Sequence, residues 1–257
     1  MNIAVCVKQI PAAEAPVGFT ADFRLRREGD PVLDDADAHG VELALRLAEA
    51  GGDEVVLLSM APDGQTSGLR TALAMGAARA VVVSDPALSG ADALSTAKVL
   101  AALARRLGVD LLVAATESSD GYTGTVPVQV AELLGWPAVT YATDARLGGG
   151  ALSARCQSEL GSDDVTCALP AVLSVTAAAI EPRYPSLRGI MAARQRPVET
   201  LDLAALGLDG STVGGAGARQ EVLSVEPAPP AVAGELVTEQ AQALDAILGS
   251  LGRWKVL

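Results

Sequence analysis

The chain has 257 residues, of which 50% are hydrophobic and 19% charged, and its mean hydropathy is +0.33. This length and apolar content provide a sizeable core, which excludes global disorder, and 26 glycines with three cysteines exclude collagen-like and disulfide-rich scaffolds. The formal net charge of −12 argues against a nucleic-acid partner, since nonspecific nucleic-acid binding needs a basic surface, and is otherwise typical of a solvated surface.

Apolar runs alternate with helical patterns over the first two-thirds of the chain. The first helix is predicted from Val41, Ala44, Leu45 and Ala48, with Asp37 as a possible N-cap. Further helices are predicted at 65–75, 92–107 and 127–134, and strands at 3–7, 55–59, 80–83, 110–115 and 137–141. Because apolar strands separated by helices are typical of a parallel sheet covered on both faces, we predict a doubly wound, mostly parallel, Rossmann-like α/β fold.

The alternation ends near residue 145. Two runs around a polar turn predict a pair of strands at 152–156 and 165–168, and a further buried strand is predicted at 171–175. A loop with two prolines and exposed character follows at 181–189.

The last fifty residues have the composition of an appendage. Gly-Gly-Ala-Gly at 214–217 and Pro-Ala-Pro-Pro at 227–230 predict a linker, and 238–251 predicts an amphipathic helix. Such a helix has too little core of its own to be a domain, so it must dock on this chain or on a partner. We therefore expect an α/β domain at 1–208 and a C-terminal linker and helix at 209–257.

Ligands of parallel α/β sheets bind beyond the carboxyl ends of the strands. The most informative of these ends is 115–126, which is rich in small and hydroxyl residues, follows a strand and leads into a helix. Backbone N–H groups there would cradle a phosphate, with Thr123 and Thr125 adding hydroxyl donors. An ordinary capped loop has the same composition, and the chain contains neither a GxGxxG nor a GxxxxGK[ST] motif.

Other polar residues offer less specific signals. Asp34, Asp35 and Asp37 would suit a metal or a ribose, but N-capping of a helix explains such a cluster equally simply, and we favour it. His39 lies near a predicted helix start and is expected to be a surface or capping residue rather than a general base, since no nucleophile or orienting partner can be placed beside it. The absence of a GxSxG motif also argues against hydrolytic catalysis.

The cysteines and the N-terminus indicate the compartment. Cys6, Cys156 and Cys167 have no zinc-site spacing, so we expect no metal, and scattered thiols fit a reducing cytoplasm. The longest apolar runs are strand-sized and no basic segment precedes them, so we expect a cytoplasmic protein that is neither exported nor embedded in a membrane.

The loop at 181–189 is the second candidate for a function. Arg183 and Tyr184 lie between prolines, and Ile190 and Met191 follow. A rigid exposed loop of this kind suits a contact surface with a Leu or Met anchor, although a crossover segment packed on its own sheet remains an alternative.

At this loop the chain resembles the beta (small) subunit of electron transfer flavoproteins. The likeness covers nearly the whole chain, and separate motifs in the same order carry it: 5–11, 33–34, 41–47, 70–77, 120–126, 131–137, 169–172, 181–187 and 190–194. The resemblance implies a heterodimer in which a larger alpha subunit holds most of an FAD and the beta subunit buries a structural AMP. It further implies a non-catalytic carrier that takes electrons from flavoprotein dehydrogenases, such as the acyl-CoA dehydrogenases of fatty acid β-oxidation, and passes them to a membrane quinone oxidoreductase.

The resemblance also assigns residues. The AMP-binding positions are Cys6, Val7, Lys8, Asp34, Ser59, Met60, Ala61, Asp120, Gly121, Thr123, Gly124, Thr125 and Val126. The partner-docking positions are Arg183, Tyr184, Leu187 as the anchor, Ile190 and Met191. The C-terminal arm would wrap the alpha subunit. Ala13 and Ala36 depart from members that place aromatic side chains toward the flavin.

Three alternatives stay open. A bifurcating type of electron transfer flavoprotein would bind a second FAD where the AMP would lie, although we favour AMP. A stand-alone nucleotide-binding or stress-type α/β protein would need no partner. An ATP-pyrophosphate-type enzyme would need an SGGxDS-like loop, which the chain lacks.

Overall fold

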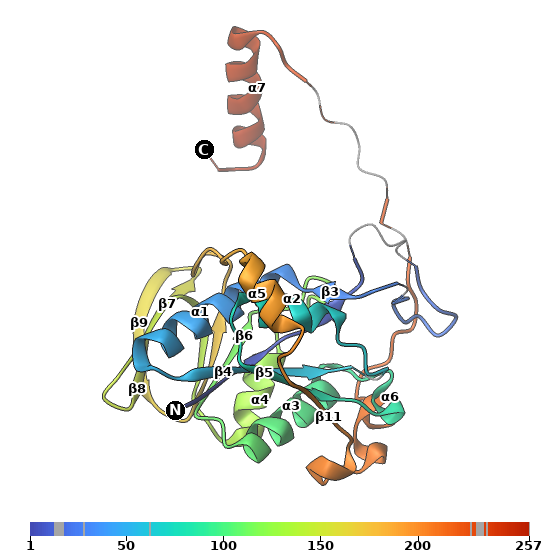
Figure 1. Ribbon diagram of the computed structural model, residues 1–257. Coiled ribbons are helices and arrows are strands. Elements are labelled where there is room, and N and C mark those ends of the chain that lie inside the picture. Colours follow the sequence, from blue (N-terminus) through green and yellow to red (C-terminus); the bar gives the residue numbers. More distant parts are fainter. Residues whose placement is uncertain are drawn as a thin grey trace. The chain divides into compact units, whose positions relative to one another are not determined.

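The computed structural model describes residues 1–12, 18–27, 29–61, 63–226, 228–229, 234 and 236–256 (Figure 1). It contains two compact units, Met1–Leu223 and Ser224–Leu257. The first unit is an α/β domain, and the second contains the helix α7 (Gln240–Arg253), close to the predicted 238–251. No helix in the described part of the chain is long and apolar enough to cross a membrane.

A sheet of nine strands forms the centre of the first unit, counted over the described residues, in the order β11-β5-β4-β1-β6-β10-β7-β8-β9. The first seven strands in that order are parallel, and β8 and β9 form an antiparallel hairpin at one edge. The strands are β1 (Asn2–Cys6), β4 (Glu54–Met60), β5 (Arg79–Val83), β6 (Leu111–Ala115), β7 (Ala138–Gly148), β8 (Ala151–Ser158), β9 (Gly161–Ala168), β10 (Ala171–Val175) and β11 (Val198–Leu201). A separate short ribbon pairs β2 (Gln9–Ile10) with β3 (Val32–Leu33).

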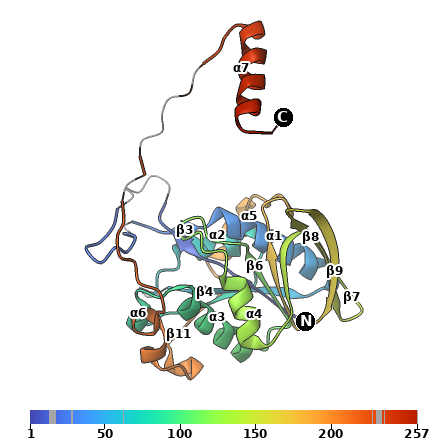
Figure 2. The same cartoon turned by 180° about the vertical axis from the view of Figure 1, so that it is seen from behind.

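Helices cover both faces of the sheet, as the apolar strands predict (Figures 1 and 2). One face carries α1 (Asp35–Gly51), α2 (Ser67–Met75) and α5 (Leu187–Ala193), and the other carries α3 (Ala93–Leu107) and α4 (Val126–Leu134). Side chains alternate between the two layers: Ile3 and Val5 of β1 pack toward the first, and Ala4 toward the second. The predicted doubly wound α/β fold is confirmed.

The first helix begins earlier than predicted. Asp34 is its N-cap, and the Asp34 carboxylate accepts a hydrogen bond from the Ala36 N–H at 3.1 Å. The prediction of Asp37 as the N-cap is wrong, because Asp37 lies inside the first turn and bonds the loop after β1. The helix ends at Gly51, and Gly52 caps it with a left-handed backbone (φ 74°), which suits glycine.

Residues 138–168 form a larger β structure than predicted. β7 extends to Gly148 instead of ending near 141, because Val139, Ala142 and Ala145 continue to face the core. The predicted strand pair after it is confirmed as the β8–β9 hairpin, which pairs Ala151 with Ala168 in antiparallel register.

The glycines at 214–217 do not form a linker. They form the short helix α6 (Gly214–Gly217), which follows a 3₁₀ turn, η3 (Gly210–Thr212), and packs beside Pro86–Leu88 (η1). A Cβ on Gly214 would approach the carbonyl oxygen of Ala87 far inside contact distance, so glycine serves close packing here rather than flexibility. Residues 227 and 230 of the predicted Pro-rich linker lie outside the described residues.

The order of the strands creates a switch point beside β1. From β1 the chain proceeds through α1 to β4 and through α2 to β5, and it then crosses to β6 on the other side of β1. The loop after β1 therefore leads to the α1 layer and the loop after β6 leads to the α4 layer (Figure 2). Divergent loops of this kind open a crevice at the carboxyl ends of the strands.

Candidate functional site

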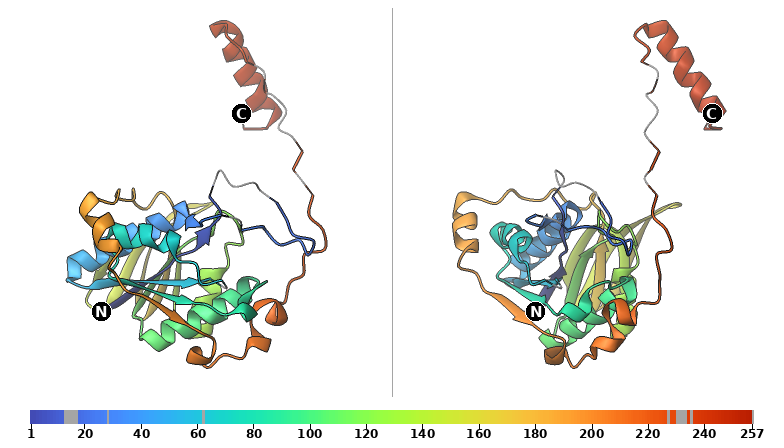
Figure 3. Two further views of the ribbon diagram at one scale, coloured as in Figure 1. Left: turned by 45° about the vertical axis from the view of Figure 1, so that its right-hand side comes forward. Right: turned by 90° about the vertical axis from the view of Figure 1, so that its right-hand side faces the viewer.

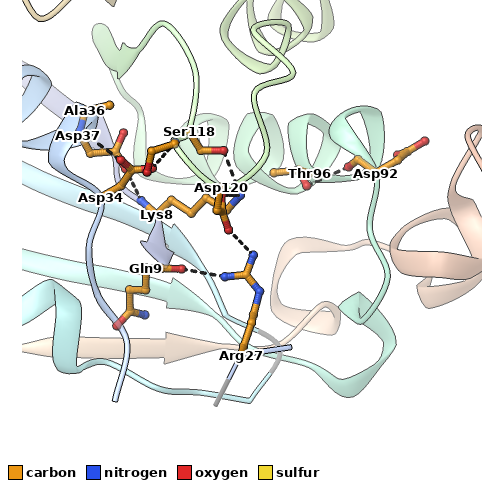
Figure 4. A network of polar contacts seen from close by, with 11 residues as sticks. Lys8, Gln9, Arg27, Asp34, Ala36, Asp37, Asp92, Thr96, Ser118 and Asp120 are labelled. Carbon is orange, nitrogen blue, oxygen red and sulfur yellow. Dashed lines mark hydrogen bonds and ion pairs between the residues drawn. The ribbon is translucent and has the colours of Figure 1, made fainter. Parts of the chain in front are cut away.

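The candidate site lies at the switch point, where polar side chains from several loops meet (Figure 4). Lys8 follows β1, and its ammonium nitrogen lies 2.5 Å from the Asp120 carboxylate and 3.1 Å from the Ser118 hydroxyl of the loop after β6. Arg27 reaches the other Asp120 oxygen at 2.6 Å and donates to the Gln9 carbonyl at 3.1 Å. One carboxylate thus joins three separate segments of the chain.

Asp120 is suited to that role by its environment. Only 8% of its side chain is exposed, while 40% of the Lys8 side chain and 47% of the Arg27 side chain are exposed. Burial alone would raise the pKa of the Asp120 carboxyl, but the hydrogen bond and charge of Lys8, with those of Arg27, bring it below its usual range. Asp120 is therefore ionised, and it holds two cations beside the carboxyl ends of β1 and β6.

The start of α1 forms the other side of this polar cluster, through Asp34 and Asp37. Asp34 is fully buried and bonds twice, to the Ala36 N–H at its own helix and to the Ser119 N–H at 2.8 Å. Asp37 accepts a hydrogen bond from the Lys8 backbone N–H. Burial raises the pKa of Asp37 to about 8, and the charges of Asp34 and Asp120 contribute to the rise, whereas the Lys8 N–H opposes it. The acidic cluster thus works as loop support, and over the described residues no three potential ligands are placed to hold a metal ion.

The loop before α4 presents a row of backbone donors. Gly124 has a positive φ of 63°, and Tyr122 also lies in the left-handed region, with φ 46°. Among the described residues, none accepts a hydrogen bond from the N–H groups of Thr123, Gly124, Thr125 or Val126. Left-handed and right-handed residues in succession turn neighbouring N–H groups to one side, which is the backbone geometry of an anion-binding nest. The α4 macrodipole adds to that preference.

The end of β4 supplies the third part of the site. Ser59 is buried, and within the described part of the chain its hydroxyl oxygen has no hydrogen-bond partner. A buried hydroxyl without a partner is costly, so it marks a place where a polar ligand atom is expected. Met60 is half-buried and Ala61 buried, which leaves an apolar margin next to this hydroxyl.

Cys6 lies at the end of β1. Burial, with the nearby Asp37 charge, raises the pKa of its thiol to about 12, so the thiol stays protonated at neutral pH. A protonated thiol is a poor nucleophile, and Cys6 acts here as a small packing residue.

The structure places most of the predicted nucleotide residues at or after the ends of the neighbouring strands β1, β4 and β6, and it places Asp34 at the start of α1. Lys8, Asp34 and Asp120 are linked directly or through one residue, while Gly121 is packed so tightly that a Cβ would lie 2.9 Å from the Ser118 hydroxyl. Arg27 was not predicted, because an arginine 93 residues from its carboxylate partner has no signal in the sequence. Ala36 lies in the first turn of α1, and Ala13 lies outside the described residues.

The predicted docking positions lie on and before α5. Tyr184 is 92% exposed and Leu187 79%, and Ile190 and Met191 are also exposed. α5 packs beside α2, on the outer side of that layer (Figure 3). Arg183 differs from its neighbours, because its guanidinium turns inward to the carboxylates of α1.

His39 is not a capping residue, because Asp34 caps α1. It is half-buried in α1, and its Nδ1 lies 2.7 Å from the carbonyl oxygen of Ile180. This contact joins α1 to a loop 141 residues away, which the sequence did not predict.

Comparisons with known proteins identify the family of the chain. The model of the family described as the electron transfer flavoprotein domain matches residues 22–206. An electron transfer flavoprotein subunit beta of Mycobacterium tuberculosis is 38% identical over 264 aligned residues, covering 100% of this chain and 99% of the relative. The subunit beta of Megasphaera elsdenii is 33% identical, covering 92% and 91% respectively.

A third relative has a different name. It is the subunit CarD of a caffeyl-CoA reductase–Etf complex from Acetobacterium woodii, and it is 32% identical over 98% of this chain and 96% of the relative. Both the match of the family model over more than half of the chain and the full-length similarity to the named subunits identify the family. The chain belongs to the electron transfer flavoprotein family, among its beta subunits.

Proposed function

We propose that the chain is the beta subunit of a cytoplasmic, heterodimeric electron transfer flavoprotein. In this role it pairs with an alpha subunit and carries electrons from flavoprotein dehydrogenases, such as acyl-CoA dehydrogenases, to a membrane quinone oxidoreductase. Its own side chains catalyse no reaction. They hold a nucleotide, support the flavin from the beta side and dock the donor.

The observation that carries the nucleotide part of the proposal is the row of N–H groups at 123–126, for which the described residues offer no acceptor. A monophosphate at the start of α4 would accept from these donors, and the Thr123 and Thr125 hydroxyls stand in the same loop. Lys8 lies at the rim and offers a positive charge. The buried Ser59 hydroxyl, which lacks a partner among the described residues, suits a polar atom of an adenine base beyond the end of β4. These residues fit an AMP.

The redox chemistry would be supplied by an FAD held mostly by the alpha subunit. The carrier role demands only that the chain bring that flavin close to the flavin of a donor and exclude water from between them. Tyr184, Leu187 and Met191 expose apolar surface on one short segment, which suits the transient contact with a donor. The C-terminal unit, Ser224–Leu257, would dock on the alpha subunit through the apolar residues of α7, which include Leu244, Ile247 and Leu248.

A second FAD in place of the AMP is the alternative. One relative is named as a subunit of a reductase–Etf complex, so the family includes members that work in a different assembly. An FAD would place its adenylate half at the same loops and extend beyond the phosphate. The diphosphate of an FAD would need more positive charge than the monophosphate of an AMP. The charges of Lys8 and Arg27 are already neutralised in part by Asp120, so we favour AMP.

The test is the cofactor content of the complex. The chain is co-expressed and purified with an alpha subunit, its own or that of a related protein, then denatured, and the extract is assayed for AMP and FAD. One FAD and one AMP per heterodimer support the proposal, whereas two FAD and no AMP support the alternative. A colourless, solitary chain without adenylate would reject both and support a stand-alone nucleotide-binding protein.

A further inference from the structure

Among the described residues, the most completely buried carboxylate outside the candidate site is that of Glu42, in the middle of α1. None of its side chain is exposed. Arg183 donates to it three times, through its backbone N–H at 3.2 Å, Nε at 2.6 Å and Nη2 at 3.1 Å. Arg46, one turn further along α1, adds a fourth bond at 2.8 Å. A fully buried carboxylate with four donors is an organised anchor, since leaving it unpaired would be strongly destabilising.

The arginine side of the pair is equally constrained. Arg183 lies between Pro182 and Pro185, and prolines fix the backbone on either side of it. Its remaining nitrogen, Nη1, donates to Glu49 at 2.6 Å, on the exposed side of α1. The carboxylates of Glu42 and Glu49, about two helical turns apart, thus bind one guanidinium group from two directions.

The far end of the same segment is fastened to α2. Arg70 donates to the carbonyl oxygens of Ala193 and Arg196, at 2.7 and 2.9 Å. Arg196 in turn donates to the carbonyl oxygens of Leu73 and Ala77. A third contact lies near the start of the segment, where His39 meets the Ile180 carbonyl. Both ends of 180–196 are therefore held by buried or half-buried polar contacts.

The middle of that segment has the opposite character. Tyr184 and Leu187 are almost fully exposed, and Met191 is more than half exposed. Exposed apolar side chains on an unsupported loop would spread over many orientations, and ordering them at a partner surface would cost affinity. The buried Glu42 carboxylate fixes Arg183, which is next to Tyr184. Much of the entropy of ordering the segment is therefore lost on folding and not on binding the partner.

We propose that Glu42 is a positioning residue for the docking segment 183–191: it touches no partner, but by holding Arg183 it sets the direction in which Tyr184 and Leu187 face. The inference rests on the proposed function, in which this segment docks the donor dehydrogenase. It assigns the affinity for the donor in part to a side chain buried in α1.

The experiment uses the heterodimer with its cofactors and measures steady-state reduction by an acyl-CoA dehydrogenase, with the heterodimer as the varied electron acceptor. In Glu42→Gln, KM for the heterodimer is expected to rise about fivefold or more while kcat at saturation stays within twofold, because docking and not electron transfer is altered. Amide hydrogen exchange at 183–191 should become faster. FAD and AMP content should not change.

Two further variants keep the test decisive. If Glu42→Gln does not fold, Arg183→Gln takes its place, since its side chain is one-third exposed and Glu42 keeps Arg46; the same rise in KM is expected, and Arg183→Lys should restore only part of the affinity. Glu199→Gln removes an exposed carboxylate 3.8 Å from Arg79 on the sheet edge and serves as the matched control. It should leave KM and the exchange at 183–191 unchanged.

The outcomes separate the inference from the function on which it rests. If Leu187→Ala raises KM but folded Glu42→Gln and Arg183→Gln do not, the positioning role is wrong and the docking segment stands. If Leu187→Ala leaves KM unchanged, the docking role itself is wrong and the inference falls with it. A drop in kcat with KM unchanged in Glu42→Gln would also overturn the inference.

Discussion

Lys8 and Asp120 form an ion pair, 2.5 Å long, between the loops that leave β1 and β6 in opposite directions. The two residues are 112 positions apart, and they meet only because β1 and β6 are neighbours at the switch point of the sheet. The pair joins the two diverging loops to each other. It also brings Arg27 to the same carboxylate, so the rim of the proposed nucleotide site depends on one buried acid.

Replacing Asp120 should destabilise the loops that it joins. In Asp120→Asn the charge that pairs with Lys8 and Arg27 is lost, and the free energy of unfolding at pH 7 should fall by about 1–2 kcal/mol, a value reduced by the exposure of both cations. The folded pKa of Asp120 is lowered, so its stabilisation exists above the unfolded carboxyl pKa of about 4 and is lost as pH falls through the folded value. Urea unfolding of variant and wild type should therefore converge below about pH 4. Asp164→Asn, which removes an exposed partner of Arg155, is the control and should have a much smaller effect at pH 7.

The proposed phosphate position can be tested by placing a negative charge in it. Thr125→Glu adds a carboxylate at the N-cap of α4, where it would repel a phosphate and compete for the unbonded N–H groups. Nucleotide retention in the purified heterodimer should weaken by at least ~1.4 kcal/mol, which is a tenfold loss of affinity. Thr125→Ser keeps the hydroxyl and should retain the nucleotide. Wild-type stoichiometry in Thr125→Glu would place the phosphate elsewhere.

The buried Asp37 predicts a pH dependence at higher pH. Its folded pKa of about 8 is raised, so its favourable contribution is complete below the unfolded value of about 4 and is lost as pH rises toward 8. Asp37→Asn keeps an oxygen to accept from the Lys8 N–H but cannot ionise. Between pH 5 and 8 the variant should lose less stability than wild type, by up to about 1.4 kcal/mol per pH unit. The thermal midpoint of the heterodimer at several pH values measures this slope. Asp35→Asn, an exposed change in the same helical turn, is the control, and identical slopes for wild type and Asp37→Asn would refute the assignment.

The contact between α5 and α2 predicts an intolerance to a single methyl group. A Cβ on Gly189 would clash with the carbonyl oxygen of Ala74, and the obstacle is backbone, which cannot rotate away. Gly189→Ala should destabilise the chain by about 1–3 kcal/mol, the usual cost of overpacking, and raise amide exchange in α5. Gly148→Ala is the matched control, because among the described residues no atom lies within 4 Å of the point that its Cβ would occupy. Equal stability of the two variants would show that α5 is not seated closely on α2.

The fold class and the approximate place of the site follow from the sequence alone. The apolar runs in β1 and β6 have no polar face, so they must be covered on both sides, and that requirement yields a parallel sheet between two helical layers. Ligand loops then have to lie at the carboxyl ends of the strands, which identifies 115–126 without knowledge of the packing. The family resemblance added the residues, and the comparisons confirmed the family.

The use of the polar residues depends on tertiary packing. The sequence places Asp34 and Asp37 three positions apart and offers both as caps, but only the packing of the Lys8 loop gives the cap to Asp34 and buries Asp37. Gly214–Gly217 has the composition of a linker, yet close approach to Ala87 makes it a packed turn. Arg27 with Asp120 and Arg183 with Glu42 are pairs more than ninety residues apart. Local spacing contains no information about such partners, because strand order and helix packing bring them together. A carboxylate that this packing buries then requires donors, and the nearby arginines supply them.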